Sequence, residues 1–341
     1  MSIESMLDAL TDSLHPVLYF LDSGKAWLDS VLCTFPGKLV LATIFYLALP
    51  RILSVAPRQV QFAAKYLFFG TAALFMSAVG CFISVGCALL DKKHLVIHIS
   101  TKIFLMIIEK PLDIKFHVKN EERLKITPAI VVCNHQSTLD VAVIGRIYPI
   151  HCSIMAKREL RYVPILGTFM KLSNVVFVNR KNHKQALQTS AYAIGYMKKN
   201  NSGMWIFPEG TRSHSEKAEL LPFKKGAFHL AIQSGEPIIP VVTQNYSHVY
   251  SSKRRYFPGG EIEIRVLEPI PTTGLTVDDV ESLLERTRTA MLESLKDMDM
   301  NQATLSSTKH FKTEQLPVPL QDMGGVEDHC EVLKKRKTLR A

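Results

Sequence analysis

The longest apolar segments of the chain lie in its first third. Tyr66 to Leu90 form a run of 25 residues without a charged side chain. A charge-free run of more than about 18 residues is typical of a membrane-embedded helix. A second apolar segment, Leu39–Ala56, is interrupted by Pro50 and Arg51, so a span, an interfacial helix and a buried helix all stay open for it. The pattern predicts membrane-embedded helices in an N-terminal membrane-associated region, residues 1–94.

From residue 95 the pattern changes to short apolar runs that alternate with stretches of helical periodicity. Six runs read as strands: Pro128–Cys133, Cys152–Ala156, Val175–Val178, Met204–Phe207, Ile238–Thr243 and Ile262–Leu267. Four stretches read as helices between them: Val141–Ile147, Glu159–Leu172, His183–Lys198 and Lys224–Gln233. This alternation predicts an α/β domain over residues 95–298, with a mostly parallel sheet flanked by helices.

The carboxyl-terminal part of the chain holds one more expected helix and then a tail. Thr276 and Asp279 have the spacing of a capping box, and apolar residues follow them at helical intervals. Residues 299–341 are polar, contain Pro317 and Pro319, and end in a basic cluster at Lys334–Lys337. We expect a disordered basic tail there, solvated more than bound to lipid.

Composition narrows the classes of partner. The formal net charge of +10 favours anionic partners. Because the basic residues are dispersed and not interleaved with aromatic ones, no nucleic acid is expected as a partner. The six cysteines contain no C-x-x-C pair, which predicts neither a zinc site nor a disulfide framework, and no metal is expected. No obligate protein partner can be inferred.

The first candidate motif is Asn134-His135-Gln136-Ser137-Thr138-Leu139-Asp140, directly after an apolar run. A neutral imidazole accepts a proton near physiological pH, and a carboxylate five residues later can fix its tautomer. Taken alone, this spacing also fits a packing histidine and a helix-terminal aspartate. Ser137 does not lie in a Gly-x-Ser-x-Gly elbow, so the sequence does not favour a serine nucleophile.

The second candidate motif is Phe207-Pro208-Glu209-Gly210-Thr211-Arg212, again at the end of an apolar run. Gly210 permits a tight turn, Thr211 and the backbone amides can donate hydrogen bonds, and Arg212 can hold a phosphate with two parallel bonds. A surface turn with a solvated arginine explains the hexapeptide equally well. Arg180, after the expected strand Val175–Val178, is a weaker candidate for the same anion. A base and an anion site together suggest acyl transfer to the hydroxyl of a phosphate-bearing acceptor.

These motifs, in this order, resemble the blocks of the glycerolipid acyltransferases, above all the 1-acyl-sn-glycerol-3-phosphate (lysophosphatidic acid) acyltransferase family. The Asn-His-x4-Asp block matches Asn134 to Asp140, and the Phe-Pro-Glu-Gly-Thr-Arg block matches Phe207 to Arg212 without a change. A proline-flanked aliphatic strand matches Pro237 to Val241, and Lys157-Arg158-Glu159-Leu160 is similar to a stretch between the blocks. The second block departs from the family pattern, because Asn174 stands where a glycine is usual.

The resemblance implies an acyl-CoA-dependent enzyme that acylates the sn-2 hydroxyl of 1-acyl-sn-glycerol-3-phosphate and yields phosphatidic acid. His135 is then the general base, assisted by Asp140, and the substrate is bound by Arg180, Glu209, Gly210, Thr211 and Arg212. Acyl-CoA enters as a co-substrate, and no cofactor is needed. The expected partners are lysophosphatidic acid, acyl-CoA and membrane lipids. The expected location is the endoplasmic reticulum membrane, with the lipid droplet as the alternative.

Three other functions stay open at this point. The first is an acyltransferase or transacylase that acts on another lysophospholipid. The second is a metal-dependent phosphohydrolase with His135, Asp140 and Glu209 as ligands, although the sequence offers no denser cluster of histidine and aspartate. The third is a non-catalytic lipid-binding or membrane-shaping protein.

Overall fold

The computed structural model of this chain describes residues 46, 48, 51, 55–179 and 183–314. The apolar segment Leu39–Ala56 lies mostly outside the described residues, and Arg180 and residues 315–341 lie wholly outside them.

The centre of the fold is a sheet of seven strands in the order β1-β7-β6-β2-β5-β3-β4. The five strands from β6 to β4 run parallel, β7 is antiparallel to β6, and β1 is parallel to β7. The strands are β1 Ile114–Lys119, β2 Ile130–Cys133, β3 Cys152–Lys157, β4 Val176–Val178, β5 Gly203–Ile206, β6 Ile238–Thr243 and β7 Gly260–Val266. The mostly parallel α/β sheet predicted from the sequence is confirmed.

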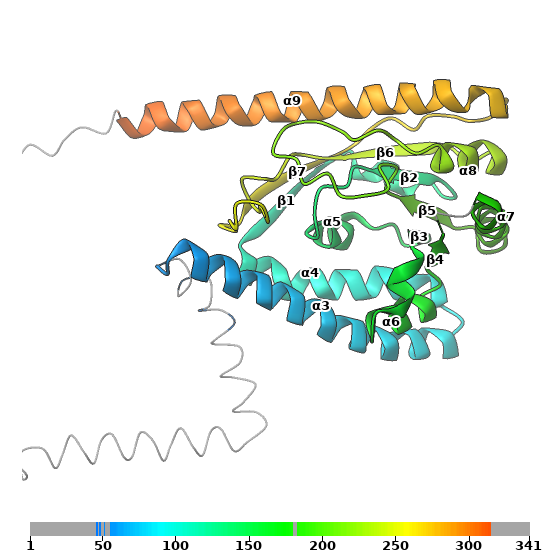
Figure 1. The fold of residues 1–341 in the computed structure, drawn as a ribbon, viewed down its shortest axis with the longest axis horizontal. Coiled ribbons are helices and arrows are strands. Elements are labelled where there is room, and N and C mark those ends of the chain that lie inside the picture. Colours follow the sequence, from blue (N-terminus) through cyan, green and yellow to red (C-terminus); the bar gives the residue numbers. More distant parts are fainter. Residues whose placement is uncertain (1–45, 47, 49–50, 52–54, 180–182, 315–341) are drawn as a thin grey trace, which may run out of the picture. The chain divides into compact units, whose positions relative to one another are not determined.

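The helices cover both faces of this sheet (Figure 1). They are α3 Arg58–Leu89, α4 Val96–Leu112, α5 Asp140–Ile147, α6 Leu166–Leu172, α7 His183–Asn200, α8 Gly226–Ser234 and α9 Val280–Glu314, with short 3-10 helices η1 Lys93–Leu95, η2 Glu121–Lys125, η3 Arg158–Tyr162 and η4 Val277–Asp279. The expected single helix Glu159–Leu172 is wrong. Pro164 disfavours a helical conformation at Val163, which is extended, and this separates η3 from α6.

The central strands β2 and β5 are apolar along their whole length because they are buried on both faces. All four residues of β2 are buried. Ile130 and Val132 pack in the core beneath α7, α8 and α9, whereas Val131 and Cys133 pack in the core on the side of α4 and α5. This period of two is the geometry of a strand between two helical layers. The cysteines that the structure describes are free thiols.

The long apolar segment forms α3, which packs along α4 and α6. One face of α3 is buried against these helices, for example at Phe69, Met76 and Gly80. The opposite face forms an exposed apolar stripe, made of Leu67, Leu74, Phe75, Phe82, Val85 and Leu89. Helices α3 and α4 belong to one compact unit with the sheet, and the boundary at residue 94 stays a prediction.

Within the described part of the chain, α3 is the one helix long and apolar enough to cross a membrane, with 32 residues and a mean hydropathy of 2.1 over its most apolar window. The expected membrane-embedded segment Tyr66–Leu90 falls on this helix.

The last helix begins at the predicted capping box, where the Thr276 and Asp279 side chains and backbones bond reciprocally. It continues to Glu314, into the region expected to be a disordered tail from residue 299. The sequence from Val280 to Glu314 contains neither glycine nor proline, and Pro317 is the first residue that cannot continue a helix. Polarity alone was therefore a poor guide to the end of this helix.

We predict that Gly80→Leu destabilises the protein and that Gly70→Leu does not. A Cβ atom at Gly80 would lie 2.5 Å from the Phe169 ring of α6, whereas nothing lies within 4 Å of one at Gly70. Overpacking of this kind costs about 1–3 kcal/mol. Thermal unfolding of both variants in detergent measures the difference, and equal midpoints would contradict the packing of α3 on α6.

Candidate active site

The two sequence motifs meet at the carboxyl ends of the central strands. The strands β2, β5 and β6 are neighbours and run parallel, so the loops that follow them leave the sheet on the same side. His135 lies two residues after β2, and Phe207 directly follows β5. The imidazole of His135 stacks on the ring of Phe207, with centroids 4.1 Å apart. Residues 72 positions apart in the sequence are thereby in contact.

The carboxylate of Asp140 holds the imidazole of His135. Asp140 Oδ2 lies 2.7 Å from His135 Nδ1 and also accepts hydrogen bonds from the backbone amides of Gln136 at 2.7 Å and Ser137 at 3.1 Å. The Asp140 side chain is 4% exposed, and that of His135 is 20% exposed. With Nδ1 engaged, Nε2 is the ring nitrogen without a partner among the residues that the structure describes. The geometry is that of an imidazole with one fixed nitrogen and one available nitrogen.

Tyr246 is a site residue that the sequence analysis missed. Its hydroxyl donates to Asp140 Oδ1 at 2.6 Å and lies 2.9 Å from Ser137 Oγ. Burial and the neighbouring Asp140 charge raise the pKa of Tyr246 well above its ordinary value, so the hydroxyl keeps its proton and acts as the donor. Tyr246 lies 106 residues after Asp140, in the loop after β6, and no local pattern marks it. Knowledge of the strand order would have been needed to find it.

Glu209, an expected substrate-binding residue, faces the protein interior. It is 3% exposed, and its two oxygens accept from the backbone amides of His135 at 2.7 Å and Leu221 at 3.0 Å. Burial raises the pKa of Glu209, while these two amides oppose the rise. The carboxylate thus connects the loop after β5 to the backbone of His135. The expectation of direct contact with substrate does not fit this placement.

The last three residues of the second motif, Gly210 to Arg212, come out to the surface beside the His135 loop. Gly210 has φ of +74°, the left-handed conformation that the turn requires, and its amide donates to Phe207 O at 3.1 Å. Thr211 and Arg212 are exposed, and Arg212 Nη1 donates to Thr138 Oγ1 at 3.2 Å. Arg212 is therefore joined to the first motif, as an anion site beside His135 requires.

Side chains continue the sheet pairing beyond the ends of the strands. The Asn134 amide group donates to Thr243 O at 2.9 Å and accepts from Thr243 N at 2.8 Å. Gln136 Nε2 donates to Thr243 O at 3.0 Å and Gln244 O at 2.8 Å. On the other side, the amides of Ser213 and His214 donate to the carbonyls of His135 and Gln136. The loop that carries His135 is fixed to both neighbouring loops.

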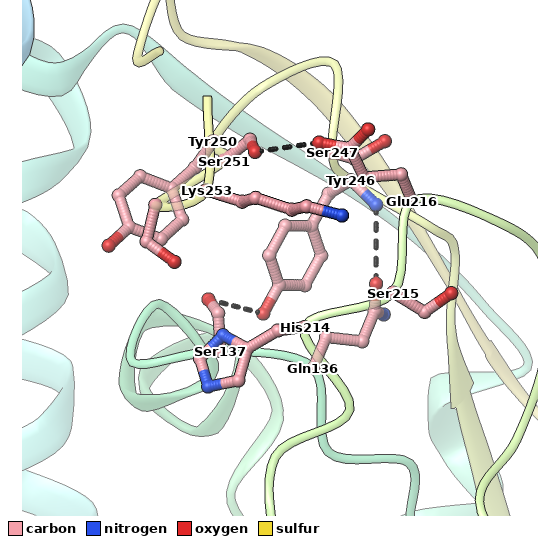
Figure 2. A pocket seen from close by; sticks show the side chains of 11 residues that line it. Gln136, Ser137, His214, Ser215, Glu216, Tyr246, Ser247, Tyr250, Ser251 and Lys253 are labelled. Carbon is pink, nitrogen blue, oxygen red and sulfur yellow. Dashed lines mark hydrogen bonds between the residues drawn. The ribbon is translucent and has the colours of Figure 1, made fainter. Parts of the chain in front are cut away.

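A small polar hollow lies next to the His135–Asp140 pair. Figure 2 shows Tyr246 at its centre, with the hydroxyl pointing toward Ser137, and the side chains of His214 and Lys253 on either side. No group of three or more histidine, cysteine, aspartate or glutamate side chains that could hold a metal ion occurs in the described part of the chain. The three metal ligands of the phosphohydrolase hypothesis do not form such a group.

Comparisons with known proteins agree with this geometry. An acyltransferase family model matches residues 115–244, which include both motifs. An uncharacterised acyltransferase of Schizosaccharomyces pombe is 43% identical over 244 residues, which cover 71% of this chain and 88% of the relative. The crystal structure of PlsC, the 1-acyl-sn-glycerophosphate acyltransferase of Thermotoga maritima, is similar with a TM-score of 0.58 and 26% identity, covering 70% of this chain and 98% of PlsC. Fold and site thus define an acyltransferase.

Relatives whose names state an activity narrow the class of acyltransferase. The 1-acyl-sn-glycerol-3-phosphate acyltransferase of Saccharomyces cerevisiae is 38% identical over 250 residues, which cover 72% of this chain and 82% of the relative. The human 1-acyl-sn-glycerol-3-phosphate acyltransferase beta is 40% identical over 199 residues, 57% of this chain and 71% of the relative. The chain belongs to the 1-acyl-sn-glycerol-3-phosphate acyltransferase family, as the sequence motifs predicted.

We predict that Glu209→Gln lowers the stability of the fold and that Glu219→Gln, at an exposed position, does not. A glutamine presents one acceptor oxygen where two amides donate, so one buried donor is left unpaired at a cost of about 1–3 kcal/mol. Thermal unfolding at neutral pH measures the difference. Unchanged midpoints for both variants would contradict the buried role of Glu209.

The stability of the Glu209→Gln variant should also depend on pH differently from that of the wild type. Because burial raises the pKa of Glu209 above its unfolded value of 4.5, the folded state binds this proton more tightly. The stability linked to it is present below pH 4.5 and is lost as pH rises through the folded pKa. Glu209→Gln should remove this loss, and thermal unfolding of both proteins across this pH range measures it.

Proposed function

We propose that this enzyme transfers the acyl group of acyl-CoA to the sn-2 hydroxyl of 1-acyl-sn-glycerol-3-phosphate and yields phosphatidic acid. The observation that carries the proposal is the His135–Asp140 pair, with Arg212 bonded to Thr138 in the same loop. This arrangement joins a base to an anion site. The names of the relatives in Saccharomyces cerevisiae and human supply the acceptor.

In the proposed reaction, His135 acts as a general base through Nε2. It removes the proton of the acceptor hydroxyl as that oxygen attacks the thioester carbonyl carbon. The tetrahedral intermediate then collapses, the carbon–sulfur bond breaks, and the imidazolium returns its proton to the departing thiolate. No acyl-enzyme forms. Asp140, held by four donors, stabilises the imidazolium, and general base catalysis of this kind contributes about 10²–10⁴ in rate.

In the same proposal, Arg212 binds the phosphate of the acceptor, with Thr211 and the turn at Gly210 beside it. Arg180 is a second candidate for the phosphate. Glu209 and Tyr246 act as positioning residues, because each touches the His135–Asp140 pair and not the solvent side of the site. Glu209 fixes the backbone of His135, and Tyr246 fixes the second oxygen of Asp140.

The apolar stripe of α3 attaches the enzyme to a membrane in this proposal. The other face of the helix is covered by α4 and α6, so the stripe is the surface left for acyl chains. Burial of apolar area contributes about 25 cal/mol for each Å² removed from water, which favours lipid contact for the large side chains of this stripe. The acceptor and the product are both lipids, so the attachment keeps the site at their surface. We propose the endoplasmic reticulum membrane, with the lipid droplet as the alternative.

We predict that purified protein in detergent releases coenzyme A from oleoyl-CoA when 1-acyl-sn-glycerol-3-phosphate is present, and that His135→Ala abolishes the release. His117→Ala, on the exposed edge strand β1, serves as the control and should keep full activity. A thiol reagent measures the released coenzyme A, and extraction of phosphatidic acid measures the product.

Each other outcome points to a different function. Release without acceptor would indicate a thioesterase, and release with lysophosphatidylcholine but not lysophosphatidic acid would indicate a different acceptor. Activity lost on treatment with a chelator would support the phosphohydrolase hypothesis. Membrane binding without turnover in either protein would support a non-catalytic role.

We predict that Arg212→Gln raises KM for 1-acyl-sn-glycerol-3-phosphate by about ten- to a hundredfold, the effect of losing a charge-assisted contact. The variant should acylate a monoacylglycerol, which lacks the phosphate, no worse than the wild type does. Arg286→Gln, at an exposed position of α9, removes the same charge elsewhere and should change neither value. An equal loss with both acceptors would mean that Arg212 supports the loop and does not bind the phosphate.

A further inference from the structure

A second basic site lies beside the edge strand β4. A groove of about 580 Å³ is lined there by Arg158 and Arg161 of η3, Lys171 of α6, and Thr189 and Tyr192 of α7. Its volume is within the range of about 300–1,000 Å³ typical of small-molecule sites. No acidic side chain is among the described residues that line it, and Arg161 and Lys171 have no ion-pair partner in the part of the chain that the structure describes.

The groove offers two kinds of contact. Three cations converge on it, and the side chain of Tyr192 is 62% exposed at its rim. Clustered cations bind phosphate groups, and an exposed aromatic ring can stack on a base. A nucleotide with several phosphates is the chemical class that uses both.

The position of the groove relative to His135 sets the length of such a ligand. Arg158 follows β3 and Asn179 follows β4, and both strands run parallel to β2. The groove therefore reaches the carboxyl ends of the strands, where His135 follows β2. Between β2 and β4 lie three inter-strand steps through β5 and β3, or about 14 Å at about 4.8 Å each. The arm of coenzyme A between sulfur and pyrophosphate has about thirteen bonds, and at the reach of an extended chain it spans roughly 15 Å.

We propose that this groove binds the 3′-phosphoadenosine diphosphate end of acyl-CoA, with Arg158, Arg161 and Lys171 on its phosphates and Tyr192 against the adenine. The proposal rests on the acyl-CoA dependence proposed above. The pantetheine arm then runs across the ends of β3 and β5 and brings the thioester to His135. The 3′-phosphate alone carries a charge of about −1.5 to −2 at neutral pH, so it is the group that the basic side chains attract most strongly.

The test compares donors that differ only in the nucleotide. The Arg161→Gln/Lys171→Gln double variant should raise KM for oleoyl-CoA by about ten- to a hundredfold, with kcat and the KM for the lysolipid unchanged. KM for oleoyl-pantetheine, which has no nucleotide, should be the same in the double variant and the wild type. Lys198→Gln/Lys199→Gln, at exposed positions at the far end of α7, removes the same charge and should behave as the wild type.

Tyr192 gives an independent arm of the test. Tyr192→Ala should raise KM for oleoyl-CoA and for its 3′-dephospho form by the same factor, because stacking does not involve the 3′-phosphate. Tyr192→Phe keeps a ring and should retain the wild-type value. A loss in Tyr192→Phe equal to that in Tyr192→Ala would overturn the stacking role.

Binding of 3′,5′-adenosine bisphosphate to the full chain in detergent separates this proposal from the proposed function. Calorimetry should detect binding to the wild type and none to the Arg161/Lys171 double variant, whether or not the wild type turns over oleoyl-CoA. No binding to the wild type would overturn the groove as a nucleotide site, and no turnover with intact binding would overturn only the acyl-CoA-dependent function.

Two further results would also overturn the proposal. An unchanged KM for oleoyl-CoA, with loss of binding to phosphatidylcholine–phosphatidylserine vesicles, would make the groove a lipid-headgroup site. An unchanged KM with new self-association would mean that the cations protect the exposed edge of β4 from pairing with another chain.

Discussion

The geometry of the site depends on the buried carboxylate of Asp140. One of its oxygens accepts from the imidazole of His135 and from the amides of Gln136 and Ser137, and the other accepts from Tyr246. A buried carboxyl group is costly unless hydrogen-bond partners surround it, so these four donors offset the burial of Asp140. Since one oxygen holds both the ring and the loop backbone, the ring cannot turn without the loop. Orientation of the base is thus a consequence of the folding of the loop.

The parallel sheet brings three separate parts of the chain together at the His135–Asp140 pair. The loops after β2, β5 and β6 leave the sheet on the same side, and they supply His135, Glu209 and Tyr246 in turn. Asn134 then pairs with Thr243 where the backbone ladder has ended. Such side-chain bonds compensate for the loss of strand pairing and keep loops in register. A rigid sheet edge is a better support for a base than a mobile loop, because catalysis needs positions held within about 0.5 Å.

The sequence was informative where one local constraint dominates. Strands buried on both faces read as continuous apolar runs, and the His135–Asp140 pair lies within five residues, so both were found. Strand β1 alternates apolar and polar residues at the sheet edge and lacks such a run, and the amphipathic helix α4 was also missed. Glu209 was expected to bind substrate together with Gly210 to Arg212, yet its side chain is directed inward and is bound by two backbone amides. Tyr246 depends wholly on strand order, which a single sequence does not encode locally.

Helix α6 connects the two proposed attachment surfaces. Its Phe169 packs against Gly80 of the apolar helix α3, and its Lys171 lines the basic groove. A helix of seven residues has room for both because residues two apart point to different sides of a helix. If the enzyme has the proposed function, the lipid acceptor comes from the membrane and the water-soluble end of the donor stays in the aqueous groove. The thioester is the part of the donor that must reach His135, after the carboxyl end of β2. A site divided in this way favours a donor whose acyl group and charged end are separated by a long polar arm.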